Sequence, residues 1–302
     1  MRVLITGGTG FIGRELAVSL AGDGHTAVLL SRSSAQVTGL PAGVCAERWD
    51  GRTAEGWSSL ADGADAIVNL AGENIGVGRW TTERKERIRQ SRLNPGRAVV
   101  ETVTRVTRKP RVVIQASAVG YYGPHGPEQI PEETPAGQDF LAQVCQDWEA
   151  STVPVEALGV RRAVIRTGVA LSKRGGALPR MMLPFRFFVG GRLGNGRQWV
   201  PWIHMRDEVR AIRFLIENES SSGAFNLTAP HPVTNAEFAH TLGRELGRPS
   251  FMPAPAFALR TLFGEMATIL LDGQRAVSQR LVQVGFDFEF PDLSPALRDL
   301  LR

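Results

Sequence analysis

The start of the chain alternates between short apolar runs and a helical pattern. Val3 to Ile5 form an apolar run of the kind found in buried strands, and a second run covers Val28 to Leu30. Between them, apolar side chains recur at Ile12, Leu16 and Leu20, which is the spacing of one helix face. A glycine-rich turn separates the first run from this helix. The pattern therefore predicts a strand, a helix and a second strand, which is a βαβ unit.

Further apolar runs predict more strands of a parallel sheet. They lie at Ala66 to Leu70, Val112 to Gln115 and Ala163 to Ile165, with long polar or helix-like stretches between them. One helix is expected from Thr81 onward, and Pro95 either kinks it or starts a second helix. Because helices must cover both faces of a buried parallel sheet, we expect an α/β fold with a Rossmann-type doubly wound parallel sheet.

The texture of the sequence changes after Gly168. Loops rich in glycine, proline and tryptophan follow, and the next regular pattern is a helix from Asp207 to Ile216 with a strand at Phe225 to Leu227. Further helices follow, so we expect a smaller, mostly helical second domain. The expected division is residues 1–168 and 207–228 for the Rossmann domain, and residues 169–206 and 229–302 for the substrate domain.

The composition fits a folded, water-soluble chain. Of its 302 residues, 43% are hydrophobic and 22% are charged, which is close to the globular average and argues against disorder. Cys45 and Cys145 lie far apart, so a disulfide framework is not expected. No apolar run approaches the roughly 20 residues that span a bilayer, and no signal-peptide pattern is present. We therefore expect a cytoplasmic protein with no membrane partner.

The net positive charge is compatible with anionic ligands but does not indicate which ligand is bound. The formal net charge is +5, and nearly all of the 35 basic residues are arginines spread along the chain. No basic cluster is interleaved with aromatic residues, so we expect no nucleic-acid partner. The five histidines lack the spacing of metal ligands, so no metal is expected.

The turn after the first strand has the pattern of a phosphate-binding loop. Glycines there let backbone N–H groups and a helix N-terminus approach a pyrophosphate closely. A turn needed only for tight packing is the alternative, but the surrounding βαβ unit favours dinucleotide binding. The cofactor-binding residues expected at this turn are Gly7, Thr9, Gly10, Phe11, Ile12 and Gly13.

The end of the second strand indicates which dinucleotide is bound. NAD enzymes usually place an acidic residue there for the ribose 2′-hydroxyl, whereas this chain has Ser31 and Arg32. A guanidinium suits a 2′-phosphate, so NADP is the expected cofactor; the alternative is that Arg32 is simply exposed. Asp50 follows the next strand region and either contacts the adenine or belongs to an acidic turn.

Five motifs, in order along the chain, resemble those of the extended short-chain dehydrogenase/reductases, the superfamily of sugar-nucleotide epimerases and dehydratases. They are Thr-Gly-Gly-Thr-Gly-Phe-Ile-Gly at 6–13, Asn-Leu-Ala-Gly at 69–72, Ser-Ala-Val-Gly-Tyr-Tyr-Gly at 117–123, Ile-Arg-Thr-Gly at 165–168 and Ile-His-Met-Arg-Asp at 203–207. Gly-Glu-Asn-Ile at 72–75 and Asp-Gly-Gln-Arg at 272–275 resemble an atypical epimerase-like subgroup with a C-terminal accessory domain. The likeness covers nearly the whole chain.

The resemblance implies that NADP binds across the C-terminal edge of the sheet. It places Leu70, Ala71 and Gly72 beneath the cofactor. It also suggests that Arg92 reaches a phosphate or a ribose, with a solvated helix face as the alternative. Glu73 would contact the ribose or, less in keeping with its position, relay a proton.

The usual catalytic pair of this superfamily is missing. The resemblance implies a serine together with a tyrosine that stands four residues before a lysine, which favours the phenolate. The only tyrosines are Tyr121 and Tyr122, and neither is followed by a lysine at that spacing. Aligning Glu149 with the family's glutamate puts Leu141 and Cys145 in the two catalytic positions, where they read as core.

Ser117 and the two tyrosines remain as catalytic candidates. Ser117 lies in the family's catalytic-serine region, and Tyr121 or Tyr122 follows at the expected lip of the nicotinamide pocket. A tyrosine without its lysine is a poor base at neutral pH but can still donate a proton, which favours reduction over epimerisation. In the alternative, Ser117 caps a strand end and the tyrosines are packing residues.

The stretch from Gly175 to Gly196 is expected to cover the substrate side. Its arginines, Arg180, Arg186 and Arg192, could hold an anionic small molecule, while its apolar residues could form core or a homodimer contact. Attachment to a membrane surface through this stretch has no other support in the sequence. His204, near the next helix, is expected to have a structural role.

Three functions are consistent with these observations. The preferred one is NADPH-dependent reduction of an unidentified small molecule. The second is a non-catalytic NADP(H)-binding sensor or interaction protein, because the catalytic pair is absent. The third, a nucleotide-sugar epimerase, rests on the family resemblance alone.

Overall fold

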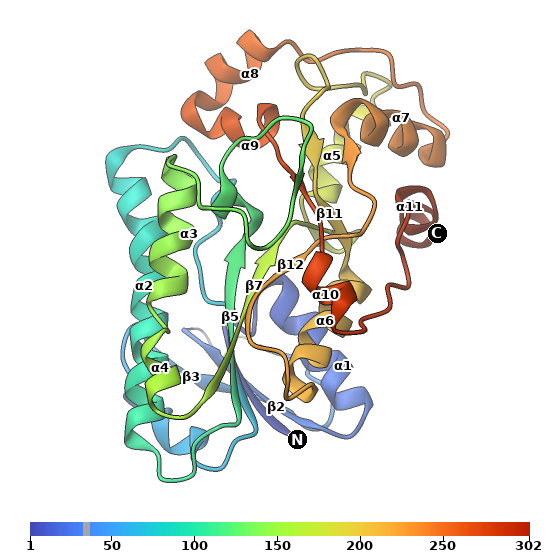
Figure 1. The fold of residues 1–302 in the computed structure, drawn as a ribbon. Coiled ribbons are helices and arrows are strands. Elements are labelled where there is room, and N and C mark those ends of the chain that lie inside the picture. The colour runs from blue at the N-terminus through green and yellow to red at the C-terminus, as the bar shows by residue number, and fades with distance from the viewer. Residues whose placement is uncertain (33–36) are drawn as a thin grey trace.

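A seven-stranded parallel sheet forms the centre of the computed structural model, which describes residues 1–32 and 37–302 (Figure 1). Its strand order is β12-β7-β5-β4-β1-β2-β3, so the order reverses between β1 and β4. The predicted doubly wound, Rossmann-type sheet is therefore confirmed. The strands are β1 (Arg2–Thr6), β2 (Thr26–Ser31), β3 (Val44–Arg48), β4 (Ala66–Asn69), β5 (Val112–Ala118), β7 (Arg161–Thr167) and β12 (Gly223–Leu227).

Helices cover both faces of this sheet. On one face, α1 (Phe11–Gly22) and α6 (Met205–Glu217) pack against the strands through Leu16, Leu20 and Ile212. The long helix α2 (Thr82–Arg105) covers the other face with Val99 and Val103. The short elements η2 (Ser58–Ala61) and α4 (Pro154–Ala157) lie on the same face as α2, and α3 (Phe140–Ala150) packs beside it.

Helix α2 runs without interruption through Pro95. Its N-cap is Thr81, whose side chain accepts the N–H of Arg84 at 3.1 Å. Pro95 is buried within the helix, so a single helix replaces the alternative of two. The helix therefore spans the sheet from its C-terminal edge, where the loop after β4 ends, to the opposite edge.

The remaining elements form a smaller, mostly helical region above the C-terminal edge of the sheet (Figure 1). Its helices are α5 (Leu178–Arg186), α7 (Asn235–Leu246), α8 (Ala256–Phe263), η4 (Gly264–Ala267), α9 (Thr268–Leu271) and α11 (Leu293–Leu301). Helix α10 (Gln279–Gln283) instead packs against β12, at the edge of the main sheet. Short strands pair here outside the main sheet. They are β6 (Gln129–Ile130) with β14 (Arg275–Ala276), β10 (Trp199–Val200) with β13 (Val233–Thr234), and β8 (Val169–Ser172) with both β9 (Gly175–Gly176) and β11 (Trp202–His204).

His204 and Asp207 tie the start of α6 to the C-terminal segment. His204 accepts the N–H of Arg206 at its Nδ1 atom, 3.0 Å away, and its ring stacks on Phe290. Asp207 is fully buried and accepts the backbone N–H groups of Glu289 and Phe290 at 2.9 and 2.8 Å. Burial lowers the pKa of His204, which keeps the ring neutral and suited to this structural role.

No helix in the described part of the chain is long and apolar enough to cross a membrane. The described cysteines form no disulfide: Cys45 is exposed and Cys145 is buried.

Candidate cofactor and active site

The glycine turn lies in direct contact with the end of β4. Gly7 has a φ of +64°, and a Cβ atom on it would stand 2.9 Å from the Cα of Ala71 and from the carbonyl of Leu70. A Cβ on Gly13 would stand 2.7 Å from the Cα of Gly8. Only glycine fits these positions, because any side chain would collide with backbone.

The turn leads into α1 without a capping side chain. Gly10 is the N-cap and makes no side-chain hydrogen bond, and the first N–H groups of a helix have no partner within it. These groups can donate to a phosphate, which the helix dipole also favours. Phe11 and Ile12 are half-buried, and the β8–β9 turn covers the ring of Phe11: a Cβ on Gly176 would lie 2.6 Å from it.

Polar and cationic side chains gather at the end of β2. The hydroxyls of Thr9 and Ser31 lie 3.2 Å apart, which joins the glycine turn to this strand. Arg32 follows, exposed, and makes no ion pair with a described residue. Asp50 accepts the N–H groups of Arg52 and Thr53 at 2.7 and 2.9 Å, and these bonds hold the pKa of its carboxyl below its usual range. Asp50 therefore shapes the turn after β3.

A row of buried polar side chains crosses the C-terminal ends of three neighbouring strands. Thr6 on β1 donates to Asn69 on β4 at 2.5 Å, and Asn69 donates to Gln115 on β5 at 2.8 Å. All three are fully buried. The row fixes the ends of the strands directly below the glycine turn and below Leu70, Ala71 and Gly72, where parallel sheets of this order bind ligands.

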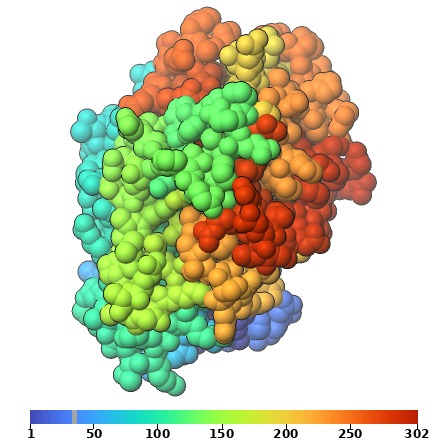
Figure 2. Space-filling model, viewed as in Figure 1, coloured from blue at the N-terminus to red at the C-terminus, as the bar shows by residue number. Residues whose placement is uncertain are grey.

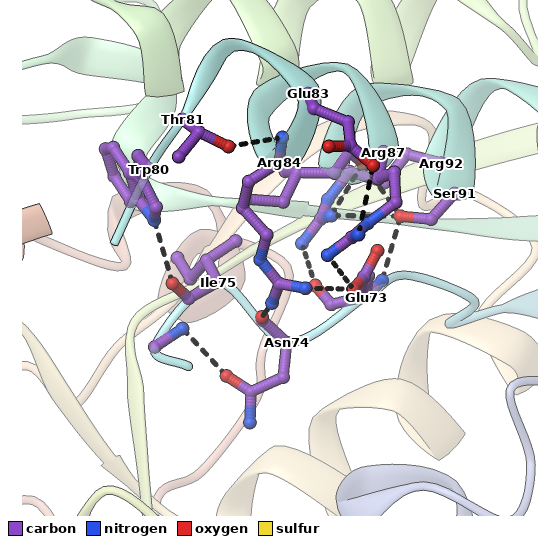
Figure 3. A network of polar contacts seen from close by, with 12 residues as sticks. Glu73, Asn74, Ile75, Trp80, Thr81, Glu83, Arg84, Arg87, Ser91 and Arg92 are labelled. Atoms are coloured by element: carbon purple, nitrogen blue, oxygen red, sulfur yellow. Dashed lines mark hydrogen bonds and ion pairs between the residues drawn. The ribbon is translucent and has the colours of Figure 1, made fainter. Parts of the chain in front are cut away.

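The carboxylate of Glu73 faces α2 (Figure 3). It forms an ion pair with Arg84 and lies 3.7 Å from Arg87. Its backbone N–H donates to the hydroxyl of Ser91 at 2.9 Å. With two guanidinium groups at its side chain, Glu73 anchors the loop after β4 to the start of α2, and a free acid is not available there for a proton relay.

Arg92 is half-buried and does not lie on a solvated helix face. Its Nη2 atom donates to the carbonyl of Glu73 at 3.2 Å, and its guanidinium stacks over Trp148 with 4.8 Å to the ring centroid. A Cβ on Gly72 would lie 3.2 Å from the guanidinium carbon. Burial lowers the pKa of Arg92. The side chain thus reaches the edge of the loop beneath the expected cofactor.

Ser117 at the end of β5 belongs to a buried ionic network. It donates its hydroxyl hydrogen to Glu149 on α3 at 2.7 Å. Arg166 on β7 holds both oxygens of the same carboxylate, at 2.9 and 3.0 Å. This bidentate pair is nearly buried, and a charge-assisted hydrogen bond of this kind is strong in such surroundings.

The two adjacent tyrosines differ sharply in environment. Tyr122 is 1% exposed, donates to Asn226 at 2.7 Å and accepts from Arg166 at 3.0 Å, and burial raises its pKa to about 12. It therefore does not reach the pocket lip. Tyr121 is half-buried, Arg166 stacks over its ring at 3.5 Å, and its hydroxyl has no hydrogen-bond partner among the described residues.

Comparison with known proteins assigns this arrangement to a family. A model of the NAD dependent epimerase/dehydratase family matches residues 3–228, well over half of the chain. The chain belongs to this family. A second model, of the domain of unknown function DUF1731, matches residues 254–300. The resemblance to extended short-chain dehydrogenase/reductases with a C-terminal accessory domain is therefore confirmed.

Several family members are similar over nearly all of this chain. The epimerase family protein SDR39U1 homolog, chloroplastic, of Arabidopsis thaliana is 40% identical over all of this chain and 87% of the relative. Epimerase family protein YfhF of Bacillus subtilis (strain 168) is 38% identical over all of this chain and 98% of the relative. The crystal structure of human epimerase family protein SDR39U1 (isoform 2) with NADPH has a TM-score of 0.88 and 34% identity, covering 99% of each chain.

Within this epimerase-family fold, the two catalytic positions on α3 are occupied by core residues. Cys145 is 5% exposed, and burial raises its pKa to about 11, so it is a neutral thiol. Leu141 packs below η3 (Val119–Tyr122), where a Cβ on Gly120 would lie 3.5 Å from it. Leu141 carries no ionisable group, and burial disfavours the thiolate of Cys145.

The residues that hydrogen-bond to Ser117 and Tyr122 were not identified from the sequence alone. Arg166 directly follows the apolar run Ala163 to Ile165 of β7, and a buried charge requires a counter-charge, so its position indicates a buried ion pair without indicating that the partner is Glu149. Asn226, which holds Tyr122, gives no such signal because it lies far away along the chain.

Proposed function

We propose that this epimerase-family protein binds NADP(H) and reduces a small molecule, with Tyr121 as the proton donor. Two features support the cofactor-binding part of this proposal. They are the glycine turn before α1 and the exposed guanidinium of Arg32 at the end of β2, which fit a dinucleotide. Two cysteines without a disulfide suit the proposed cytoplasmic location. When bound, NADPH supplies a hydride to the substrate.

One observation carries the choice of Tyr121. Of the three catalytic candidates, Tyr121 is the one whose hydroxyl has no partner among the described residues. Ser117 gives its hydrogen to Glu149, and Tyr122 gives its hydrogen to Asn226. Tyr121 stands directly after the C-terminal end of β5, at the same sheet edge as the glycine turn, and Arg166 fixes its ring from one side.

The substrate class follows from the arginines of the small region. Arg180 is engaged with the carbonyl of Gly76 at 2.8 Å, which ties α5 to the loop after β4. Arg186 and Arg192 are exposed and form no ion pair with a described residue. An anionic small molecule remains the proposed class.

The second candidate function is an NADP(H)-binding sensor without hydride transfer. The specific observation in its favour is the partly buried Leu141 and the buried thiol of Cys145 at the two positions that the family resemblance implies for catalysis. This candidate shares the cofactor site with the reductase and differs from it only in lacking a chemical step after NADPH has bound.

An isotope-transfer experiment separates the two functions. The protein is incubated in a small-molecule extract with NADPH that carries deuterium at both hydrogens of the reactive nicotinamide carbon, and the extract is searched for labelled products by mass spectrometry. A labelled product that disappears with Tyr121→Phe supports the reductase. Tight NADPH binding with no labelled product supports the sensor.

Arg32→Ala tests the proposed NADPH binding independently of the proposed reduction. Loss of one charge-assisted contact is expected to weaken NADPH binding by about ten- to a hundredfold and to leave NADH binding unchanged. Arg105→Ala, on the far end of α2, is the matched control. An unchanged preference for NADPH in Arg32→Ala would overturn the assignment of this residue.

A further inference from the structure

Large apolar side chains are exposed together on the small helical region. Most of the strongly exposed apolar residues of the described chain fall in two segments, 183–189 and 251–269. Phe187, Phe251 and Phe257 are 69%, 70% and 73% exposed. The others are Leu183, Phe188, Val189, Met252, Leu262 and Ile269. A gathering of this kind marks a surface that a partner covers.

The two segments lie side by side in the fold. The N–H of Met252 donates to the carbonyl of Gly190 at 3.1 Å, and the N–H of Ala254 donates to the carbonyl of Arg192 at 2.9 Å. Figure 2 shows them in yellow and orange at the top of the molecule. Helix α8 follows at once, and none of its residues is buried although most are apolar. We call residues 183–197 and 248–262 the cationic apolar surface.

This surface carries positive charge without compensation. Residues 175–206 and 246–264 contain no aspartate or glutamate. Four exposed arginines there form no ion pair with any residue that the structure describes: Arg186, Arg192, Arg197 and Arg248. The flanking acids are already engaged: Glu265 pairs with Lys85, Glu245 pairs with Arg298, and Asp272 lines a hollow together with Arg260, which attracts it. The partner that fits must therefore be anionic as well as apolar.

The tip of the surface is held in an unusual conformation. Phe188 has a φ of +62° and is the one non-glycine residue with a positive φ in the described chain. A bulky residue in this region is strained, by about 1–3 kcal/mol. The turn leaves both Phe187 and Phe188 exposed at the end of α5, and Arg248 stacks over the ring of Phe188 at 4.5 Å.

A cavity in the same surface is lined by both cationic and apolar side chains. A cavity of about 390 Å³ is lined by Arg192, Ser250 and Phe251, together with Ala236 and Pro253. A guanidinium and a hydroxyl are donors for a phosphate oxygen, and the phenyl ring beside them offers an apolar contact. A phospholipid headgroup with the start of its acyl chains presents the same combination.

We propose that the cationic apolar surface binds the surface of an anionic membrane. Exposed phenylalanines insert at the boundary between headgroups and acyl chains, and arginines around them are attracted by acidic lipids. The amino-acid sequence by itself does not indicate such attachment, because the apolar tip at 183–189 and the apolar helix α8 are brought together only by the fold.

Two other occupants fit the surface less well. A second copy joined by a two-fold axis would bring together two surfaces that both carry unpaired positive charge. Single-stranded nucleic acid could stack on the exposed phenylalanines, but the aliphatic side chains of Leu183, Val189 and Leu262 among them give its bases no stacking surface, whereas acyl chains contact both kinds of side chain.

Co-sedimentation with vesicles tests the proposal on the whole protein. Vesicles of phosphatidylcholine with about one third phosphatidylglycerol are expected to retain the protein, and pure phosphatidylcholine is expected to retain at least about tenfold less. Raising the salt to about 0.5 M should release the protein. The double variants Phe187→Ser with Phe257→Ser and Arg192→Gln with Arg248→Gln should each lower binding about tenfold or more, with an unchanged melting temperature.

Val18→Ser is the matched control, because Val18 is 53% exposed on α1, away from this surface. The proposal is overturned if the acidic vesicles do not retain the protein, or if Val18→Ser lowers retention as much as the phenylalanine variants do. It is also overturned if a single-stranded oligonucleotide is bound through the same arginines while vesicles are not, or if light scattering shows a dimer that the phenylalanine variants dissociate.

Discussion

Ser117 donates its only hydroxyl hydrogen to Glu149 across 2.7 Å. The two oxygens of this carboxylate also accept hydrogen bonds from Arg166, at 2.9 and 3.0 Å. Ser117 therefore offers lone pairs, and no hydrogen, to anything bound above the end of β5. In the proposed reduction, Ser117 can therefore accept a hydrogen bond from the substrate, and the proton would have to come from another side chain.

Replacing the two tyrosines separately should give opposite results. Tyr121→Phe removes the hydroxyl without a partner and is expected to lower the rate of label transfer from NADPH by about a hundredfold or more at an unchanged melting temperature. Tyr122→Phe leaves Asn226 and Arg166 without a buried partner, so it should destabilise the protein by about 2 kcal/mol and keep label transfer in the folded fraction. Equal effects of both changes on label transfer would contradict the assignment.

Breaking the Glu149–Arg166 pair should cost far more than breaking a similar pair at the surface. Glu149→Gln leaves the guanidinium of Arg166 buried with a neutral partner, and we expect a loss of about 3 kcal/mol in the free energy of unfolding. Glu156→Gln is the control, because Glu156 is half exposed beside Arg162 and should change stability by less than about 1 kcal/mol. Urea titration measures both, and similar losses would refute the structural importance of the buried pair.

Alanine substitutions at two glycines with nearly the same φ can separate the cost of backbone strain from the cost of a steric collision of the Cβ atom. Gly24 has a φ of +74° with open space where a Cβ would stand, whereas a Cβ on Gly7 would collide with the backbone of Leu70 and Ala71. Gly24→Ala should therefore cost only about 1 kcal/mol of strain and keep NADPH binding. Gly7→Ala should cost more and abolish NADPH binding measured by calorimetry. Normal binding by Gly7→Ala would show that the turn does not approach the cofactor.

The buried Glu208 is expected to make the free energy of unfolding depend on pH. It is fully buried, with one oxygen 2.8 Å from the hydroxyl of Thr167 and the other without a partner in the described chain, and burial raises its pKa to about 8. The unfolded chain loses this proton near pH 4.3. Unfolding therefore releases a proton between about pH 4.3 and 8, so this group lowers stability progressively as the pH rises through that window.

Glu208→Gln should remove this dependence. The variant is expected to gain on the order of 3 kcal/mol over the original chain at about pH 8 and little at about pH 4. Thermal unfolding across this range measures the difference, with the exposed Glu83→Gln as a control that keeps the original profile. Parallel profiles for Glu208→Gln and the original chain would show that Glu208 is not protonated in the folded state.

The parts of the fold that could be predicted from sequence are those with local signals. Apolar runs indicated β1, β4, β5 and β7, and the glycine turn could be placed before α1 because glycine spacing reports backbone geometry directly. The candidate catalytic side chains could be named from the sequence but not ranked. Ser117, Tyr121 and Tyr122 differ only in their partners, and those partners, Glu149 and Asn226, are brought in from distant elements.

The pairing of β6 with β14 sets the order in which a newly made chain can complete its site. The glycine turn and the β2 end lie within the first 32 residues, so the cofactor half can form once β4 and β5 have emerged from the ribosome. The segment that carries Tyr121 can be fixed in place only later in synthesis. Gln274 must donate to the carbonyl of Val119, and the N–H of His125 must reach the carbonyl of Gly273. During translation, the proposed cofactor site can thus form before the segment that carries Tyr121 is held in place, because residues 273–276 are made after both.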